Sequence, residues 1–134
     1  MTWIFEGKEV NHLSDLPPES YGFVYIITEI PTGRKYIGQK RLWSGKTKKK
    51  RKETNWKRYF GSSRKLQEEI EIRGESSYSR EIVFVCTNKA EMNFLELKEQ
   101  MDNDVLFTDE YYNEYIGARI TSRGLGRLKD TLNV

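Results

Sequence analysis

Two short apolar segments joined by a turn place the strongest constraint on the fold of this 134-residue chain. The first segment reads FVYIITEI and the second reads KYIGQ, with Pro31-Thr32-Gly33 between them. Runs rich in β-branched and aromatic residues are typical of strands, and a short loop containing Pro and Gly is typical of a hairpin connection. The pattern predicts a hairpin over about residues 22–40, in which Tyr25 and Tyr36 come near each other at one end of a sheet.

A block of positive charge follows this hairpin. From Arg34 to Arg58 the chain holds twelve lysine and arginine residues and a single acid. The block carries about +11 in a chain whose net charge is +3, and such a concentration attracts a polyanion, most commonly nucleic acid. Trp43 and Trp56 flank the charges and either hold the segment in place or stack on bases, whereas a solvated loop without a partner is the alternative. The residues expected to contact DNA are Lys40, Lys46, Lys48, Lys49, Lys50, Arg51, Lys57 and Arg58.

Helix and strand signals follow the basic loop, residues 42–58. A helix is expected to begin at Ser62 or Ser63, because either hydroxyl can accept a hydrogen bond from a free N–H group, and to end before Gly74. YSREIVFVCT predicts a strand near the centre of the sheet.

A second helix is expected after this strand. Asn88, three residues before Glu91, is typical of a helix cap. The helix is expected to run to about Asn103. Its core candidates include Met92, Leu95 and Met101.

This order, β-β-α-β-α, predicts an α+β domain with a small, mostly antiparallel, three-stranded sheet flanked by helices. The expected domain covers residues 21–120, after a lead-in over residues 1–20 that holds a candidate edge strand, WIFEGKEV. A tail covers residues 121–134. Cys86 is the only cysteine, so no internal disulfide can form, and no apolar run reaches the length of a membrane span. A cytoplasmic protein is expected.

The hairpin residues resemble a known motif. FVY…YIG is similar to the motif of the GIY-YIG nucleases, with FVY in place of GIY. The similarity continues in YFGSS before the first helix, in Leu95-Glu96 and in Tyr112-Asn113, so it covers roughly residues 21–120. The chain resembles the small, stand-alone nucleases of phages and mobile elements, which include homing endonucleases.

The resemblance implies a metal-dependent DNA endonuclease that leaves 5′-phosphate and 3′-hydroxyl ends. By this resemblance Tyr25 activates water, Tyr36 orients the water or the phosphate, and Glu96 binds one Mg²⁺ or Mn²⁺. Asn113 would fix Glu96 or the phosphate. A free phenol titrates near pH 10, so the basic block is expected to lower the pKa of Tyr25.

The resemblance leaves some assignments open. The family's arginine corresponds to Arg41, beside the motif, or to Arg64, at the start of the helix, with Arg41 slightly preferred. Gly38 allows a close approach of backbone and substrate or is a simple turn residue. His12, the only histidine, is expected at the surface. Glu91 and Glu99 are rivals of Glu96.

Two other functions are alternatives to a GIY-YIG endonuclease. One is a nucleic-acid-binding module that keeps the fold without the chemistry. The other is a nuclease of the PD-(D/E)xK type that uses Glu96 and Lys98. The expected partner is double-stranded DNA. A single small centre cuts one strand at a time, so a double-strand break needs a dimer or two successive events.

Overall fold

The computed structural model describes residues 2–116, which form an α+β structure with a sheet between two helices. The main sheet has the order β2-β1-β7-β3-β4. β1 runs parallel to β7, and the other neighbours in this sheet are antiparallel. The strands of this sheet are β1 (Trp3–Phe5), β2 (Lys8–Val10), β3 (Gly22–Glu29), β4 (Lys35–Arg41) and β7 (Tyr78–Cys86).

The expected three-stranded sheet is therefore too small. The additional strands, β1 and β2, come from the N-terminal lead-in and are only three residues long. Strands this short show no clear alternation in sequence, so only WIFEGKEV as a whole indicated an edge strand. Trp3 anchors β1, because its side chain is 1% exposed and its indole N–H donates to the carbonyl of Trp56 at 2.7 Å.

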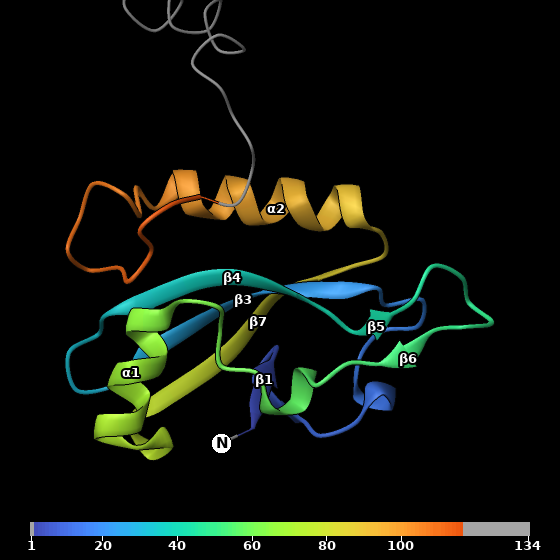
Figure 1. Ribbon diagram of the computed structural model, residues 1–134, viewed down its shortest axis with the longest axis horizontal. Helices are drawn as coiled ribbons and strands as arrows, with labels where there is room; N and C mark the ends of the chain where they lie inside the picture. Colours follow the sequence, from blue (N-terminus) through green and yellow to red (C-terminus); the bar gives the residue numbers. More distant parts are fainter. Residues whose placement is uncertain (1, 117–134) are drawn as a thin grey trace, which may run out of the picture.

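The two helices cover opposite faces of the sheet (Figure 1). α1 (Arg64–Arg73) begins after Ser63, whose Oγ accepts from the backbone N–H of Leu66 at 3.2 Å. α2 (Lys89–Asp102) begins after Asn88, whose Oδ1 accepts from the N–H of Glu91 at 2.8 Å. Both caps satisfy backbone groups that the first helical turn leaves free, as the sequence predicted.

Side-chain alternation along β3 builds two cores. Phe23 and Tyr25 face the α1 side, in a cluster with Trp3 and Trp56. Val24 faces the α2 side with Met92 and Cys86. This alternation follows from the two-residue period of a strand, and it sends Tyr25 to the face opposite α2.

The basic loop, residues 42–58, contains a small hairpin of β5 (Trp43–Ser44) and β6 (Lys52–Glu53), followed by the short helix η2 (Trp56–Arg58). Leu42 and Trp56 are fully buried at its two ends. The residues at its tip, 45–51, are exposed. The aromatic residues therefore attach the hairpin to the core, and its charges face solvent. The other short helices are η1 (Leu13–Asp15) and η3 (Glu75–Ser77).

After α2 the chain returns to β4. A parallel bridge pairs Lys35 with Tyr111, and the backbone N–H of Tyr112 donates to the carbonyl of Lys35 at 2.7 Å. The expected tail, residues 121–134, lies outside the described residues. Neither α1 nor α2 has the length and apolar character that crossing a bilayer requires.

Candidate active site

Tyr25 lies at the centre of a cluster of three tyrosines on the α1 side of the sheet. Its ring centroid is 6.2 Å from that of Tyr36 and 6.0 Å from that of Tyr59. Tyr25 pairs across the hairpin with Gly38, and a Cβ built on Gly38 would lie 2.4 Å from the phenol oxygen of Tyr25. Gly38 is thus needed for the close approach of the phenol to β4, rather than for a turn.

Tyr36 occupies the more accessible side of this cluster. Its hydroxyl forms a hydrogen bond of 3.0 Å with the hydroxyl of Ser62, just before α1. The two residues line a hollow of about 520 Å³. Arg64 lines the same hollow and forms an ion pair with Glu68 at 3.4 Å.

Lys40 supplies a cation to the cluster. Its Nζ lies 4.2 Å from the centroid of the Tyr59 ring, and partial burial lowers its pKa. The sequence placed Lys40 among the outer DNA contacts and gave Tyr59 no catalytic role. The spacing could have shown the placement of Lys40, because residues 36, 38 and 40 of one strand share a face.

Burial raises the pKa of both family tyrosines. The Tyr25 phenol has 0% exposure, and desolvation is the main reason that its pKa lies well above 10. Tyr59, Tyr36 and Glu96 add to this rise. Desolvation also raises the pKa of Tyr36, against the lowering effect of its hydrogen bond with Ser62. The expected lowering of the Tyr25 pKa is absent from this structure, so the phenol is neutral at pH 7.

Glu96 approaches the same strand from the α2 side. Its side chain is 7% exposed, and its Oε1 accepts from Nε2 of Gln39 at 2.8 Å. Among residues 2–116 no cation forms an ion pair with Glu96. Burial raises the pKa of this carboxyl, and the hydrogen bond from Gln39 opposes the rise. Its negative charge adds slightly to the rise in the pKa of Tyr25 and of Tyr36.

The environment of Glu96 fits a divalent cation. A buried carboxylate without a counter-charge is costly, and a bound cation would remove that cost. No group of three or more His, Cys, Asp or Glu side chains suited to a metal occurs in the described part of the chain. Mg²⁺ does not need such a group, because it keeps several waters and is often held by one or two carboxylates.

Asn113 is attached to the backbone of β4. Its Oδ1 accepts from the N–H of Ile37 at 3.0 Å, and its Nδ2 donates to the carbonyl of Ile37 at 2.8 Å. Gln100 from α2 donates to the same carbonyl at 3.1 Å. Both ends of the Asn113 amide are therefore bonded to the strand between Tyr36 and Gly38, where they can position that strand.

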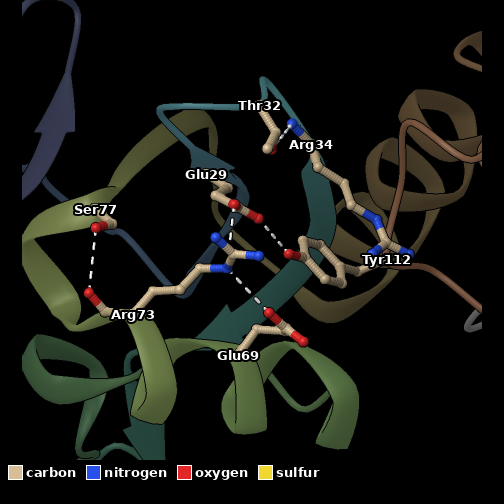
Figure 2. Close-up of polar contacts among 7 residues, drawn as sticks. All are labelled: Glu29, Thr32, Arg34, Glu69, Arg73, Ser77 and Tyr112. Atoms are coloured by element: carbon tan, nitrogen blue, oxygen red, sulfur yellow. Dashed lines mark hydrogen bonds and ion pairs between the residues drawn. The ribbon is translucent and has the colours of Figure 1, made fainter.

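A polar cluster holds the segment that contains Tyr112 and Asn113 in place (Figure 2). Glu29 is 2% exposed and accepts a hydrogen bond of 2.5 Å from the hydroxyl of Tyr112. Nε of Arg73 lies 3.3 Å from the other oxygen of Glu29. The guanidinium carbon of Arg34 lies 3.9 Å from the centroid of the Tyr112 ring. The cluster fixes Tyr112 and thereby places Asn113, the next residue, against β4.

The remaining candidates lie elsewhere. Arg41 is exposed on the α2 side of β4, with its guanidinium carbon 5.4 Å from the Tyr21 ring centroid. Lys98 is exposed and pairs with Asp102 at 2.5 Å, so it does not converge with the buried Glu96 as a PD-(D/E)xK site requires. His12 is exposed, as expected. The other expected DNA contacts, Lys46, Lys48, Lys49, Lys50, Arg51, Lys57 and Arg58, are all exposed.

The fold and the paired tyrosines agree with those expected of a GIY-YIG domain. Residues 3–116 match the family model described as "Putative endonuclease segE, GIY-YIG domain". The chain therefore belongs to this family, and the resemblance in the hairpin is confirmed. The match begins within β1, so it includes most of the lead-in. Searches of curated proteins and of solved structures each gave no match.

Proposed function

We propose that this protein is a metal-dependent DNA endonuclease whose active site lies on the edge strand β4. The arrangement around β4 is the observation that supports this proposal. Tyr25, Tyr36 and Lys40 meet on one face of the strand, and Glu96 reaches it from the other. These groups are the kinds that phosphodiester hydrolysis requires, namely groups that position water, a cation for the phosphate and a metal ligand.

Glu96 would hold the metal, Mg²⁺ or Mn²⁺. When bound, such an ion lowers the pKa of a coordinated water and neutralises charge on the phosphate. The neutral phenol of Tyr25 orients the attacking water by hydrogen bonding. To take a proton from the water, Tyr25 would first have to be a phenolate, which needs local positive charge that lowers its pKa; the proton would then pass to solvent. Gln39 keeps the Glu96 carboxylate in place through its hydrogen bond.

Lys40 and Tyr36 would act on the phosphate. Lys40 donates from its ammonium group to a non-bridging oxygen, where negative charge grows in the transition state. Tyr36 and Ser62 position the phosphate within the hollow that they line. Arg64, from the same hollow, would provide a second, planar contact with the phosphate. Water would form the new bond to phosphorus while the P–O3′ bond breaks. The 3′ oxygen would leave and take up a proton from solvent, so that the products carry 5′-phosphate and 3′-hydroxyl ends.

The ends of the product test this reaction. A duplex labelled at one 5′ end is incubated with protein and Mg²⁺, and the products are then treated with ligase and with a polymerase. Ends that are ligated and extended without prior phosphatase or kinase treatment support 5′-phosphate and 3′-hydroxyl products. Ends that carry a 3′-phosphate would contradict the proposed attack.

Lys40→Met is expected to lower the cleavage rate at saturating protein by about 10²-fold, the usual effect of removing one donor that stabilises the transition state. The substitution keeps a long, unbranched side chain and removes the ammonium group that lies over the Tyr59 ring. Single-turnover cleavage measures the rate, and fluorescence anisotropy in EDTA measures the Kd for DNA, which should change by less than about threefold because one phosphate contact contributes little alone.

Lys8→Met is the matched control, because Lys8 is an exposed lysine of β2, at the far edge of the sheet. Its cleavage rate should stay at the wild-type level, and Lys40→Arg should recover part of the lost rate. A Lys40→Met protein that cleaves normally at saturation would show that Lys40 is only an outer DNA contact.

A further inference from the structure

A deep groove lies next to the active site, between the N-terminal lead-in and the basic hairpin. One wall is formed by residues 13–21, and the other by the hairpin from Trp43 to Arg51. The groove has a volume of about 610 Å³. Four cations line it, namely Arg41, Lys46, Lys48 and Arg51. We refer to it as the Trp43 groove. Its positive charge favours an anionic ligand.

The rings of Trp43 and Tyr21 add flat aromatic surfaces to the cations of the Trp43 groove. The guanidinium carbon of Arg51 lies 3.9 Å from the centroid of the Trp43 ring, and that of Arg41 lies farther, 5.4 Å, from the centroid of the Tyr21 ring. The indole N–H of Trp43 donates to the carbonyl of Ser20 at 3.1 Å, so the ring joins the two walls. Stacked guanidinium and aromatic groups bind nucleobases by their flat faces.

The size of the groove is that of a pocket for a small ligand. Its volume of about 610 Å³ lies within the range of about 300–1,000 Å³ that is typical of such pockets, which suits one or two nucleotides rather than a duplex. The combination of cations, flat aromatic groups and this size therefore matches an unpaired strand.

The groove continues toward the tyrosine cluster. A neighbouring hollow shares Arg41 and Trp43 with the Trp43 groove and is also lined by Lys40 and Tyr59. From residue 41 to residue 36 of β4 the distance is about 17 Å at ~3.3 Å per residue, which a few nucleotides of one strand can span. A strand held in the groove would thus reach the site where cleavage is proposed.

We propose that the Trp43 groove binds unpaired nucleotides beside the scissile phosphate, so that the protein prefers DNA containing an unpaired segment over fully paired DNA. The choice of DNA as the ligand rests on the proposed function. Cations at the groove bind the phosphates of the strand, and the stacked Trp43 and Arg51 side chains bind a base.

An ion pair across the mouth of the groove affects this binding. Nζ of Lys48 lies 3.5 Å from a carboxylate oxygen of Glu19 on the opposite wall, and both side chains are more than three-quarters exposed. An exposed pair of this kind is weak, so a phosphate can displace it. Glu19 also repels phosphate. Glu19→Gln should therefore strengthen binding of the unpaired segment by about two- to fivefold at low salt.

The test measures binding in EDTA, where metal-dependent cleavage does not occur. Fluorescence anisotropy gives the Kd of the wild-type protein for a labelled blunt duplex and for the same duplex with a central three-nucleotide bulge. We expect at least fivefold tighter binding of the bulged DNA, since one stacked base contributes a measurable part of the affinity. Trp43→Leu and Arg51→Ala should each abolish most of this preference while changing the Kd for the blunt duplex less.

The double variant Lys49→Ala, Lys50→Ala is the matched control. Both lysines lie on the same hairpin, but neither lines the groove. Their loss should weaken binding to both DNA forms alike and reduce the salt dependence by about one unit per charge. Arg51→Ala keeps the test valid if Trp43→Leu misfolds, since Arg51 is exposed.

Several outcomes would overturn the proposal. Equal affinity of the wild-type protein for the two DNA forms is one, and an equal loss by Arg51→Ala on both forms is another. Tighter binding of the matched RNA bulge than of the DNA bulge would overturn the assignment to DNA. Cleavage plays no part in this measurement. A preference for bulged DNA would therefore stand even if the protein failed to cut DNA, and cleavage could be observed even if this preference were absent.

Discussion

The Glu96→Gln variant is expected to lose Mg²⁺-dependent cleavage by at least about 10²-fold, because a neutral amide is a poor ligand for Mg²⁺. The substitution nearly preserves volume, and the amide can still accept the hydrogen bond from Gln39 through its oxygen. Cleavage of supercoiled plasmid in 10 mM Mg²⁺ measures the effect. The control is Glu99→Gln, on the same helix and less buried, which should cleave normally.

Metal binding by Glu96 can also be measured without activity. Addition of Mg²⁺ at pH 7 should raise the free energy of unfolding of the wild-type protein, by about 2.7 kcal/mol at one hundred times the Kd, and leave Glu96→Gln unchanged. Equal stabilisation of both proteins, or a damaging Glu99→Gln together with an unaffected Glu96→Gln, would place the metal elsewhere.

The raised pKa of Glu96 also predicts a pH dependence of the metal-free protein. The folded state favours the protonated carboxyl. Its contribution to stability is therefore fully present below the ordinary pKa of 4.5 and is lost as pH rises through the raised pKa. Urea unfolding from pH 4 to pH 7 should show this loss in the wild-type protein but not in Glu96→Gln. Identical pH profiles would contradict the burial of a titrating carboxyl.

Tyr25→Phe is expected to lower the rate of cleavage by about 10²- to 10⁴-fold, the range for a group that takes part in proton transfer. The ring remains, so the contacts with Trp3, Phe23 and Tyr36 survive and DNA binding in EDTA should stay within about twofold. Single-turnover rates at saturating protein measure the loss.

Tyr78→Phe controls for the loss of a buried hydroxyl. Tyr78 is also 0% exposed and belongs to the same core, but it comes from β7 and lies outside the proposed site. Its cleavage rate should match the wild-type rate. If Tyr25→Phe cleaves as fast as Tyr78→Phe, Tyr25 has no part in the reaction.

The central elements could be predicted from the sequence because their signals are local. The hairpin of β3 and β4, the caps at Ser63 and Asn88 and the strand β7 each depend on residues close together in the chain. The same locality placed the two family tyrosines near each other. By contrast, β1 pairs with β7, which lies more than seventy residues away in the chain. The residues around β1 do not show which strand it pairs with, so this pairing could not be predicted.

The buried face of α2 could be inferred only in part from hydrophobicity. Of its core candidates, Met92 is 2% exposed and Leu95 packs against the same core, but Met101 is 54% exposed. The buried face carries Met92, Glu96 and Gln100 at four-residue intervals. Two of these three side chains are polar, because they hydrogen-bond to Gln39 and to the backbone of Ile37. A search for apolar periodicity finds Met92 and Leu95 but misses Glu96 and Gln100, because these buried side chains are polar.

Strand alternation could have placed Lys40 on the same face as Tyr36, but its contact with the Tyr59 ring depends on tertiary packing that spacing does not give. A lysine within a basic block is most simply interpreted as an outer phosphate contact, and its position over the Tyr59 ring requires the hairpin and η2 to fold together. The preference for Arg41 over Arg64 has the same origin. Distance along the chain favoured Arg41, whereas Arg64 lines the hollow with Tyr36.

Plasmid cleavage tests the central claim most directly. Purified protein is incubated with supercoiled plasmid in Mg²⁺, in EDTA and in EDTA followed by excess Mg²⁺, and Glu96→Gln is assayed beside it. The proposed active site predicts nicked or linear plasmid in Mg²⁺, none in EDTA, recovery after Mg²⁺ is restored and at least about 10²-fold less product from Glu96→Gln. Intact plasmid under every condition, or equal cleavage by the wild-type protein in EDTA, would contradict it.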